Sequence, residues 1–174
     1  MATYKIDAAH SDIYFKVKHL AISTVIGSFK SFDATLEAEK DDFSDLKVSF
    51  EADINSISTN NDQRDQHLKS ADFFDAEKYP KLTFNSTSVT KDGDELEVKG
   101  DLTLHGVTNA VVLTAEYNGS VVDPYGQSKV GFDIKGKIKR KDFGLTWSAV
   151  TEAGSIVVSD EVKLEFAVQF IKQA

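Results

Sequence analysis

Apolar and polar residues alternate along nearly the whole chain, and this pattern constrains the fold more than any other feature. In one segment, for example, Leu46, Val48 and Phe50 alternate with polar neighbours. Successive side chains of a β-strand point to opposite faces, so a period of two indicates strands with one buried face. The apolar rows of the alternating segments begin at Ile13, Phe32, Leu46, Leu82, Leu96, Val111, Val130 and Val162. The pattern therefore predicts an all-β protein with at least eight strands.

The connections between these segments are short. Residues 91–94, 105–106 and 124–126 carry the Gly, Pro and Asp typical of turns. Strands joined by short turns pair antiparallel, and closure into a barrel removes the exposed edges of such a sheet. We expect a barrel rather than a two-sheet sandwich, because many of the segments are longer than the strands of a sandwich usually are.

One segment, residues 60–79, breaks the alternation. Asn60 or Asn61 can cap a helix, Asp62 suits its first turn, and helix-compatible residues continue to about Ser70. We expect one short helix around residues 61–71. Because the chain shows no internal repeat and no linker, residues 1–174 are expected to form a single domain.

Composition excludes several classes of function. The chain has no cysteine, so a disulfide, a thiolate zinc site and a cysteine nucleophile are ruled out. Its apolar runs are far shorter than the roughly 20 residues of a membrane helix, so no membrane insertion is expected. A net charge of −8 disfavours nucleic acid and anionic lipid surfaces as partners. With no basic and apolar leader, we expect a cytoplasmic protein, or a periplasmic or secreted one if a leader was removed.

The interior of an eight-stranded barrel is either filled by side chains or encloses one small ligand. Small residues such as Ala34, Gly100 and Gly136 share the inward phase with bulky phenylalanines. They leave room for a ligand, unless they compensate for neighbouring rings or relieve curvature. A cavity here would have no charge in mid-strand, which favours a chain-like apolar ligand over a sugar or nucleotide. Its candidate lining residues are Phe15, Val17, Phe50, Phe84, Leu102, Phe132, Ile134 and Phe166.

Three polar side chains are candidates for a site at an end of the barrel. Arg64 and His67 lie together on the expected helix, where they could receive a polar head group or pin the helix across the barrel end. Arg140 continues the inward phase of Ile134, and its planar fork of donors could contact a phosphate or carboxylate. Alternatively, the guanidinium pairs with an acid of this chain. The acids considered are Asp65, Asp142 and Asp160.

The histidines do not indicate a metal site or a catalytic centre. His10, His19, His67 and His105 form no close pair of the kind found in zinc sites, and the chain has no nucleophile elbow or phosphate-binding loop. We therefore expect no metal, no cofactor and no enzymatic activity. The enzymatic alternative would require His10, His19 or His67 to lie beside a carboxylate near the cavity.

A series of short motifs spans the chain in a fixed order. They occupy residues 4–7, 10–11, 15–17, 27–29, 64–68, 72–75, 79–80, 100–108 and 138–145. In this order they resemble the YceI-like family of lipocalin-like, polyisoprenoid-binding proteins. The resemblance implies an extended eight-stranded antiparallel lipocalin-like β-barrel, often periplasmic or secreted, whose elongated apolar pore takes an isoprenoid chain or another long amphiphile.

The resemblance also suggests contacts and partners. Arg64, His67 and Arg140 are the suggested contacts of the ligand's head group. The expected partner is a long-chain isoprenoid, an isoprenoid quinone or a fatty-acid-like lipid, held by a monomer or homodimer that carries or sequesters it. An enzyme acting on such a lipid and a ligand-free, stress-related structural protein remain the alternatives.

Overall fold

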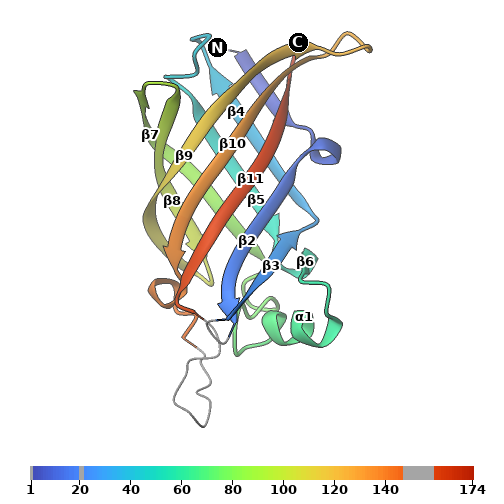
Figure 1. Cartoon of the computed structure of the whole chain (residues 1–174), viewed down its shortest axis with the longest axis vertical. Helices are drawn as coiled ribbons and strands as arrows, with labels where there is room; N and C mark the ends of the chain where they lie inside the picture. The colour runs from blue at the N-terminus through green and yellow to red at the C-terminus, as the bar shows by residue number, and fades with distance from the viewer. Residues whose placement is uncertain (1, 20–21, 147–158) are drawn as a thin grey trace.

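The computed structural model describes residues 2–19, 22–146 and 159–174. In these residues eleven strands form one antiparallel sheet that closes into a barrel (Figure 1). The strands are β1 (Ala2–Ile6), β2 (Asp12–His19), β3 (Ser23–Phe29), β4 (Phe32–Ala38), β5 (Lys47–Asp53), β6 (Ile57–Ser58), β7 (Lys81–Asp92), β8 (Glu95–Leu104), β9 (Val107–Val122), β10 (Ser128–Lys139) and β11 (Glu161–Lys172). Short 3-10 turns lie at Ala8–His10, Ile54–Ser56 and Arg140–Phe143.

Three pairs of consecutive strands, β1 and β2, β3 and β4, and β5 and β6, each behave as one bent strand. The barrel wall therefore has eight strands. Both β1 and β2 pair with β11, while β4 continues from β3 and β6 follows β5 after a single 3-10 turn. In one half of the barrel β1 pairs with β4. In the other half β2 pairs with β3, and β3 pairs with β6, so each bent strand keeps the same neighbours on both sides of its bend. The predicted eight-stranded antiparallel barrel is therefore confirmed.

The predicted turns form where the backbone permits them. In the hairpin between β8 and β9, His105 and Gly106 have φ angles of 55° and 73°, as a two-residue turn with a matching twist requires. Between β9 and β10, the Asp123 carboxylate accepts the backbone N–H groups of Tyr125 and Gln127, each at 2.9 Å. These local contacts set the register of the long strands.

The one α-helix of the described residues, α1 (Asp62–Lys69), lies at one end of the barrel, which we call the lower end (Figure 1). The side chain of Asn61 caps it by accepting the backbone N–H of Arg64 at 3.0 Å. The predicted helix is therefore confirmed, slightly shorter than expected. The two chain termini lie at the opposite end, which we call the upper end (Figure 1).

At the upper end an ion cluster ties the start of the chain to the hairpin between β9 and β10. Lys129 Nζ lies 2.9 Å from Asp7 Oδ2 and 3.5 Å from Asp123 Oδ2. Burial raises the pKa of Asp7, but hydrogen bonds from Lys129 and His10 outweigh it, so the pKa is lowered overall. The pKa of Asp123 is also lowered, first by the backbone N–H of Gln127.

The lowered pKa values predict acid sensitivity. A carboxylate with a lowered folded-state pKa contributes stability that is complete above its unfolded pKa, near 4, and is lost as the pH falls through the folded value. We expect the thermal midpoint to drop below about pH 4, and Lys129→Met to make that drop smaller by removing a shared partner of Asp7 and Asp123. Thermal unfolding of both proteins from pH 7 to pH 2 measures this, and parallel curves would contradict it.

Candidate functional site

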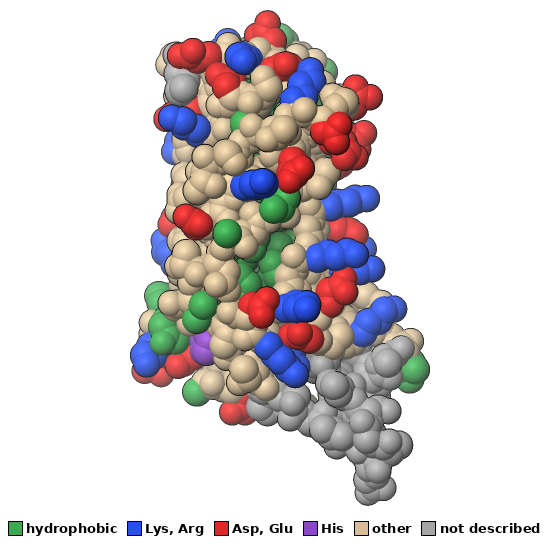
Figure 2. Space-filling model, turned by 90° about the vertical axis from the view of Figure 1, so that its left-hand side faces the viewer, with side chains coloured by type: hydrophobic (Ala, Val, Ile, Leu, Met, Phe, Trp, Pro, Cys, Tyr) green, Lys and Arg blue, Asp and Glu red, His purple; other side chains and the backbone are tan. Residues whose placement is uncertain are grey.

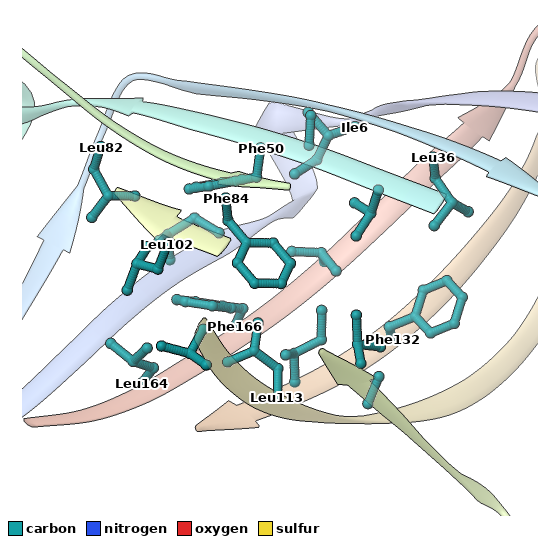
Figure 3. Close-up of a pocket in the computed structure, with 18 of the residues that line it drawn as sticks. Ile6, Leu36, Phe50, Leu82, Phe84, Leu102, Leu113, Phe132, Leu164 and Phe166 are labelled. Carbon is teal, nitrogen blue, oxygen red and sulfur yellow. The ribbon is translucent and has the colours of Figure 1, made fainter. Parts of the chain in front are cut away.

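The barrel is not filled by its side chains. An inner cavity of about 110 Å³ lies inside it (Figure 3). Aliphatic and aromatic side chains line it, and among the described lining residues only Tyr14 has a polar side-chain atom. Such a lining offers no partner for the polar groups of a sugar or nucleotide.

Seven of the eight predicted apolar residues line this inner cavity, and the eighth, Val17, lines a second cavity below it. Their rings pack near the middle of the barrel: Phe50 stacks on Phe166 with centroids 6.2 Å apart and on Phe32 at 6.3 Å. The seven are Phe15, Phe50, Phe84, Leu102, Phe132, Ile134 and Phe166. Alternation places them there, because each belongs to the inward phase of its strand.

Two inward glycines do not leave room as expected. A Cβ on Gly100 would lie 2.5 Å from the Phe84 ring and from the Asn85 carbonyl oxygen. A Cβ on Gly136 would lie 2.5 Å from Leu113. The two glycines therefore compensate for neighbouring large side chains, which was the alternative, whereas Ala34 and Ala115 line the inner cavity.

The second cavity, the mouth cavity, occupies the lower end and measures about 260 Å³. It brings together Arg64, His67 and Arg140, the three polar residues singled out from the sequence. It shares part of its wall with the inner cavity, so the two cavities adjoin, and together we call them the tunnel. The shared residues are Phe15, Phe29, Leu82, Ile138 and Leu164.

At the upper end of the barrel interior lies Phe43, a residue that the sequence reasoning missed. Phe43 is 3% exposed, and its ring centroid lies 5.0 Å from that of Tyr117, 5.3 Å from Phe132 and 5.5 Å from Tyr4. It belongs to the loop between β4 and β5 and has a φ of 61°. Its ring therefore packs against Phe132, one of the residues that line the inner cavity.

Acidic neighbours hold this loop in shape. Asp45 accepts the backbone N–H groups of Glu39 and Lys40, at 2.9 and 3.1 Å. Asp42 accepts from the side chain and backbone of Ser44, and these bonds lower the pKa of Asp42 to about 2. In the sequence, the signal for Phe43 is a single phenylalanine between acidic residues whose side chains accept hydrogen bonds from the backbone of the loop.

At the mouth, Arg64 is fixed to the strand end beside the helix. Its Nε donates to Thr59 Oγ1 at 2.7 Å and its Nη2 donates to Thr59 O at 2.6 Å. Asp65 in turn accepts the N–H and hydroxyl of Thr59 at 2.8 and 2.5 Å, and both residues are buried. These bonds pin α1 across the barrel end and hold the guanidinium at the mouth.

His67 lies at the rim of the mouth cavity. Its Nε2 is 3.0 Å from Asp72 Oδ2, and its ring meets Phe73 edge-on at 5.1 Å. His10 pairs with Asp7 at 2.8 Å, but it lines neither cavity. Of the three histidines in the enzymatic alternative, His67 is therefore the one found beside both a carboxylate and a cavity; the side chain of His19 lies outside the described residues.

Arg140 is the buried charge at the mouth, with 3% of its surface exposed. Its Nη1 donates to Leu145 O at 2.7 Å and its Nε to Ser159 O at 3.0 Å. Burial lowers the pKa of Arg140, while the nearby Asp160 acts in the opposite direction. Of the three acids considered as its partners, Asp160 is the one whose charge acts on it, and Asp65 is bonded to Thr59.

Two further features bear on chemistry. Among the described residues, no three or more acidic, histidine or cysteine side chains are grouped so as to hold a metal ion. Within residues 2–19, 22–146 and 159–174, no helix is long and apolar enough to cross a bilayer.

Comparison with known proteins adds to this geometry. The profile of the family described as "YceI-like domain" matches residues 4–170. Protein YceI of Salmonella newport (strain SL254) is 43% identical over 174 residues, which cover 99% of this chain and 88% of that protein.

Solved structures match the barrel over almost its whole length. The Campylobacter jejuni YceI protein is 37% identical with a TM-score of 0.77, covering 97% of this chain and 96% of that one. Burkholderia cenocepacia BcnA (23% identity, TM-score 0.82, 94% and 98% covered) and a polyisoprenoid binding domain from Saccharophagus degradans (18%, 0.71, 98% and 98%) share the fold.

Proposed function

Because the chain belongs to the YceI-like domain family, we propose that its barrel binds one long apolar or amphiphilic molecule: an isoprenoid, an isoprenoid quinone or a fatty-acid-like lipid. The observation that carries this proposal is the apolar tunnel, with Phe43 packed at the upper end of the barrel and Arg64, His67 and Arg140 lining its lower cavity. The fold shared with a polyisoprenoid binding domain supports it.

The tunnel suits a chain rather than a compact ligand. The 12 residues of β10, at roughly 3.3 Å each and tilted by about 40°, span roughly 30 Å along the barrel axis. Burying about 300 Å² of hydrocarbon in such a space contributes roughly 7 kcal/mol. This is enough to hold a lipid without any covalent bond, and it supports a carrier or sequestering role.

The polar end sets the orientation of the ligand. The apolar tail extends toward Phe43, and the head group lies at the mouth with Arg64 and His67. The guanidinium of Arg64, already fixed on Thr59, favours a head group that accepts hydrogen bonds or carries negative charge. Acidic and basic side chains are intermingled over the face seen in Figure 2, so selection of the tail rests on the interior.

Native mass spectrometry of the purified protein, followed by organic extraction, tests this proposal. We expect one lipid per chain, either as isolated or after incubation with prenyl alcohols, quinones and fatty acids. Absence of any bound lipid under all these conditions would favour a ligand-free barrel.

The pair formed by His67 and Asp72 beside the mouth is the observation that fits the enzymatic alternative. The same extraction separates the two functions. A carrier returns the added lipid with its mass unchanged, whereas an enzyme returns a modified lipid. Loss of that modification in His67→Gln, with binding retained, would establish chemistry at the mouth.

Phe43 is expected to limit the length of the bound chain. Phe43→Ala removes the ring at the upper end, and each methylene group that then becomes buried adds about 0.8 kcal/mol, or roughly fourfold in affinity. Competition between a short and a long prenyl alcohol should shift toward the long one by at least tenfold.

Phe73→Ala is the matched control, because Phe73 is similarly buried but lies at the mouth. Both changes remove a buried ring and should cost about 3–5 kcal/mol of stability, so thermal midpoints are compared first. An unchanged preference in Phe43→Ala would mean that the tail does not reach the upper end.

A further inference from the structure

Six lysines gather on the outside of the lower half of the barrel, on β2, β10 and β11. On the same strands Val17, Ile138 and Leu164 point inward and line the mouth cavity. The lysines, which we call the basic face, are therefore on the outer side of the wall around the mouth. They are Lys16, Lys18, Lys135, Lys137, Lys139 and Lys163.

The strand register brings like charges together on this face. Lys137 lies opposite Lys163 across β10 and β11, and Lys163 lies opposite Lys16 across β11 and β2. Like charges directly opposite each other destabilise a sheet. Two glutamates offset part of this: Glu165 lies 2.9 Å from Lys16 and Glu161 lies 3.6 Å from Lys137.

Six lysines against two glutamates leave a local excess of positive charge in a chain whose net charge is −8. In Figure 2 the strands at the front of Figure 1 form the right-hand edge, where Lys and Arg side chains project from the barrel among Asp and Glu side chains. The remaining surface carries the negative excess. A flat anionic partner is thus attracted to this face and repelled by the others.

Exposed isoleucines extend the basic face toward the lower end. Ile26 lies opposite Lys16 across β2 and β3 and is 50% exposed, and Ile22, just before β3, is 84% exposed. Cationic side chains next to protruding apolar ones are typical of surfaces that bind the interface of a bilayer.

A shallow hollow on the outside of β9, β10 and β11 adds a place for a head group. Its volume is about 460 Å³. Three lysines of the basic face line it together with Glu165, and Val112 and Thr114 of β9 form its other side. The lysines are Lys135, Lys137 and Lys163.

From these observations we propose that the basic face docks the barrel on an anionic lipid bilayer, with the mouth beside the membrane surface. The charge excess supplies the attraction, Ile22 and Ile26 supply apolar contact, and the position of the face next to the mouth favours a lipid surface over an acidic protein. Docking there would shorten the path of a lipid between bilayer and tunnel.

Co-sedimentation with vesicles tests the proposal. The wild-type protein is expected to bind vesicles of phosphatidylglycerol and phosphatidylcholine at low salt. It should release them at about 1 M salt, where the Debye length is about 3 Å. It should not bind vesicles of pure phosphatidylcholine. A lysine near an anionic surface contributes about fivefold in affinity, so the triple substitution K16Q, K137Q and K163Q should weaken binding about a hundredfold. Ile22→Ser should weaken it several-fold.

The triple substitution K47Q, K81Q and K99Q is the matched control, because it removes three exposed lysines of other strands, β5, β7 and β8. Its vesicle binding should stay within twofold of wild type. The thermal midpoint of the basic-face variant should change little, since relief of the row of like charges offsets the loss of the ion pairs with Glu165 and Glu161.

Absence of vesicle binding at low salt, or equal losses in the two triple variants, would overturn the proposal. Sedimentation measures docking, and mass spectrometry measures lipid uptake. A barrel that docks but takes up no lipid therefore refutes only the proposed function, and one that takes up lipid but does not dock refutes only the basic face as a docking surface.

Discussion

Replacing Ala115 with phenylalanine is expected to abolish lipid binding while leaving the barrel folded. Ala115 lies on β9 opposite Leu96 of β8 and Ile134 of β10, is 3% exposed, and lines the inner cavity. A phenyl group at this position takes up space that the tail would occupy. Displacing three or four methylene groups of buried chain loses roughly 3 kcal/mol, or about a hundredfold in affinity.

Ala110→Phe is the control for this experiment. Ala110 belongs to the same strand but has the opposite phase and is exposed, so the added ring lies outside the barrel. We expect its affinity for a fluorescent fatty acid, measured by titration, to match that of the wild type. If Ala115→Phe bound the probe equally well with an unchanged thermal midpoint, the ligand would not occupy the inner cavity.

The second large effect is expected at Arg140, and it concerns stability. Arg140→Met removes two charge-assisted hydrogen bonds and leaves the carbonyl groups of Leu145 and Ser159 without these donors. Leaving such groups unpaired in a buried site costs about 3 kcal/mol. For a chain of this size that loss lowers the thermal midpoint by roughly 10 °C.

Two further variants separate the fold from the head group. Lys141→Met removes an exposed cation from the same 3-10 turn and should change stability by about 0.5 kcal/mol or less. Arg140→Lys keeps the charge but not the planar fork, so it should recover only part of the lost stability. A thermal midpoint of Arg140→Met equal to that of the wild type would show that these bonds contribute nothing to stability.

The barrel could be predicted from the sequence because a period of two records which face of a strand is buried. The rows beginning at Leu96 and Val130, for example, are inward along their whole length, so the lining residues followed directly. The bends that divide three of the wall strands were not visible, since alternation continues on both sides of each bend.

Features that depend on contacts between distant segments could not be predicted from this pattern. Phe43 lies in a loop without alternation, and its burial against Tyr117 and Phe132 depends on the closed barrel. Gly100 looked like open space because its partner, the Phe84 ring, belongs to another strand. Net charge likewise gave no indication that lysines of three strands share one face.

The pairing of β1 with β11 has a consequence for how the protein is made. Tyr4 lies opposite Lys172, so the first strand to be synthesised must wait for the last before the wall can close. Pairing between such distant segments is slow, and until then the lipid-facing wall remains open to water and to other chains. The nascent protein is therefore most prone to aggregate in this interval, and it is also then that a lipid can enter along the full length of the groove rather than through the mouth.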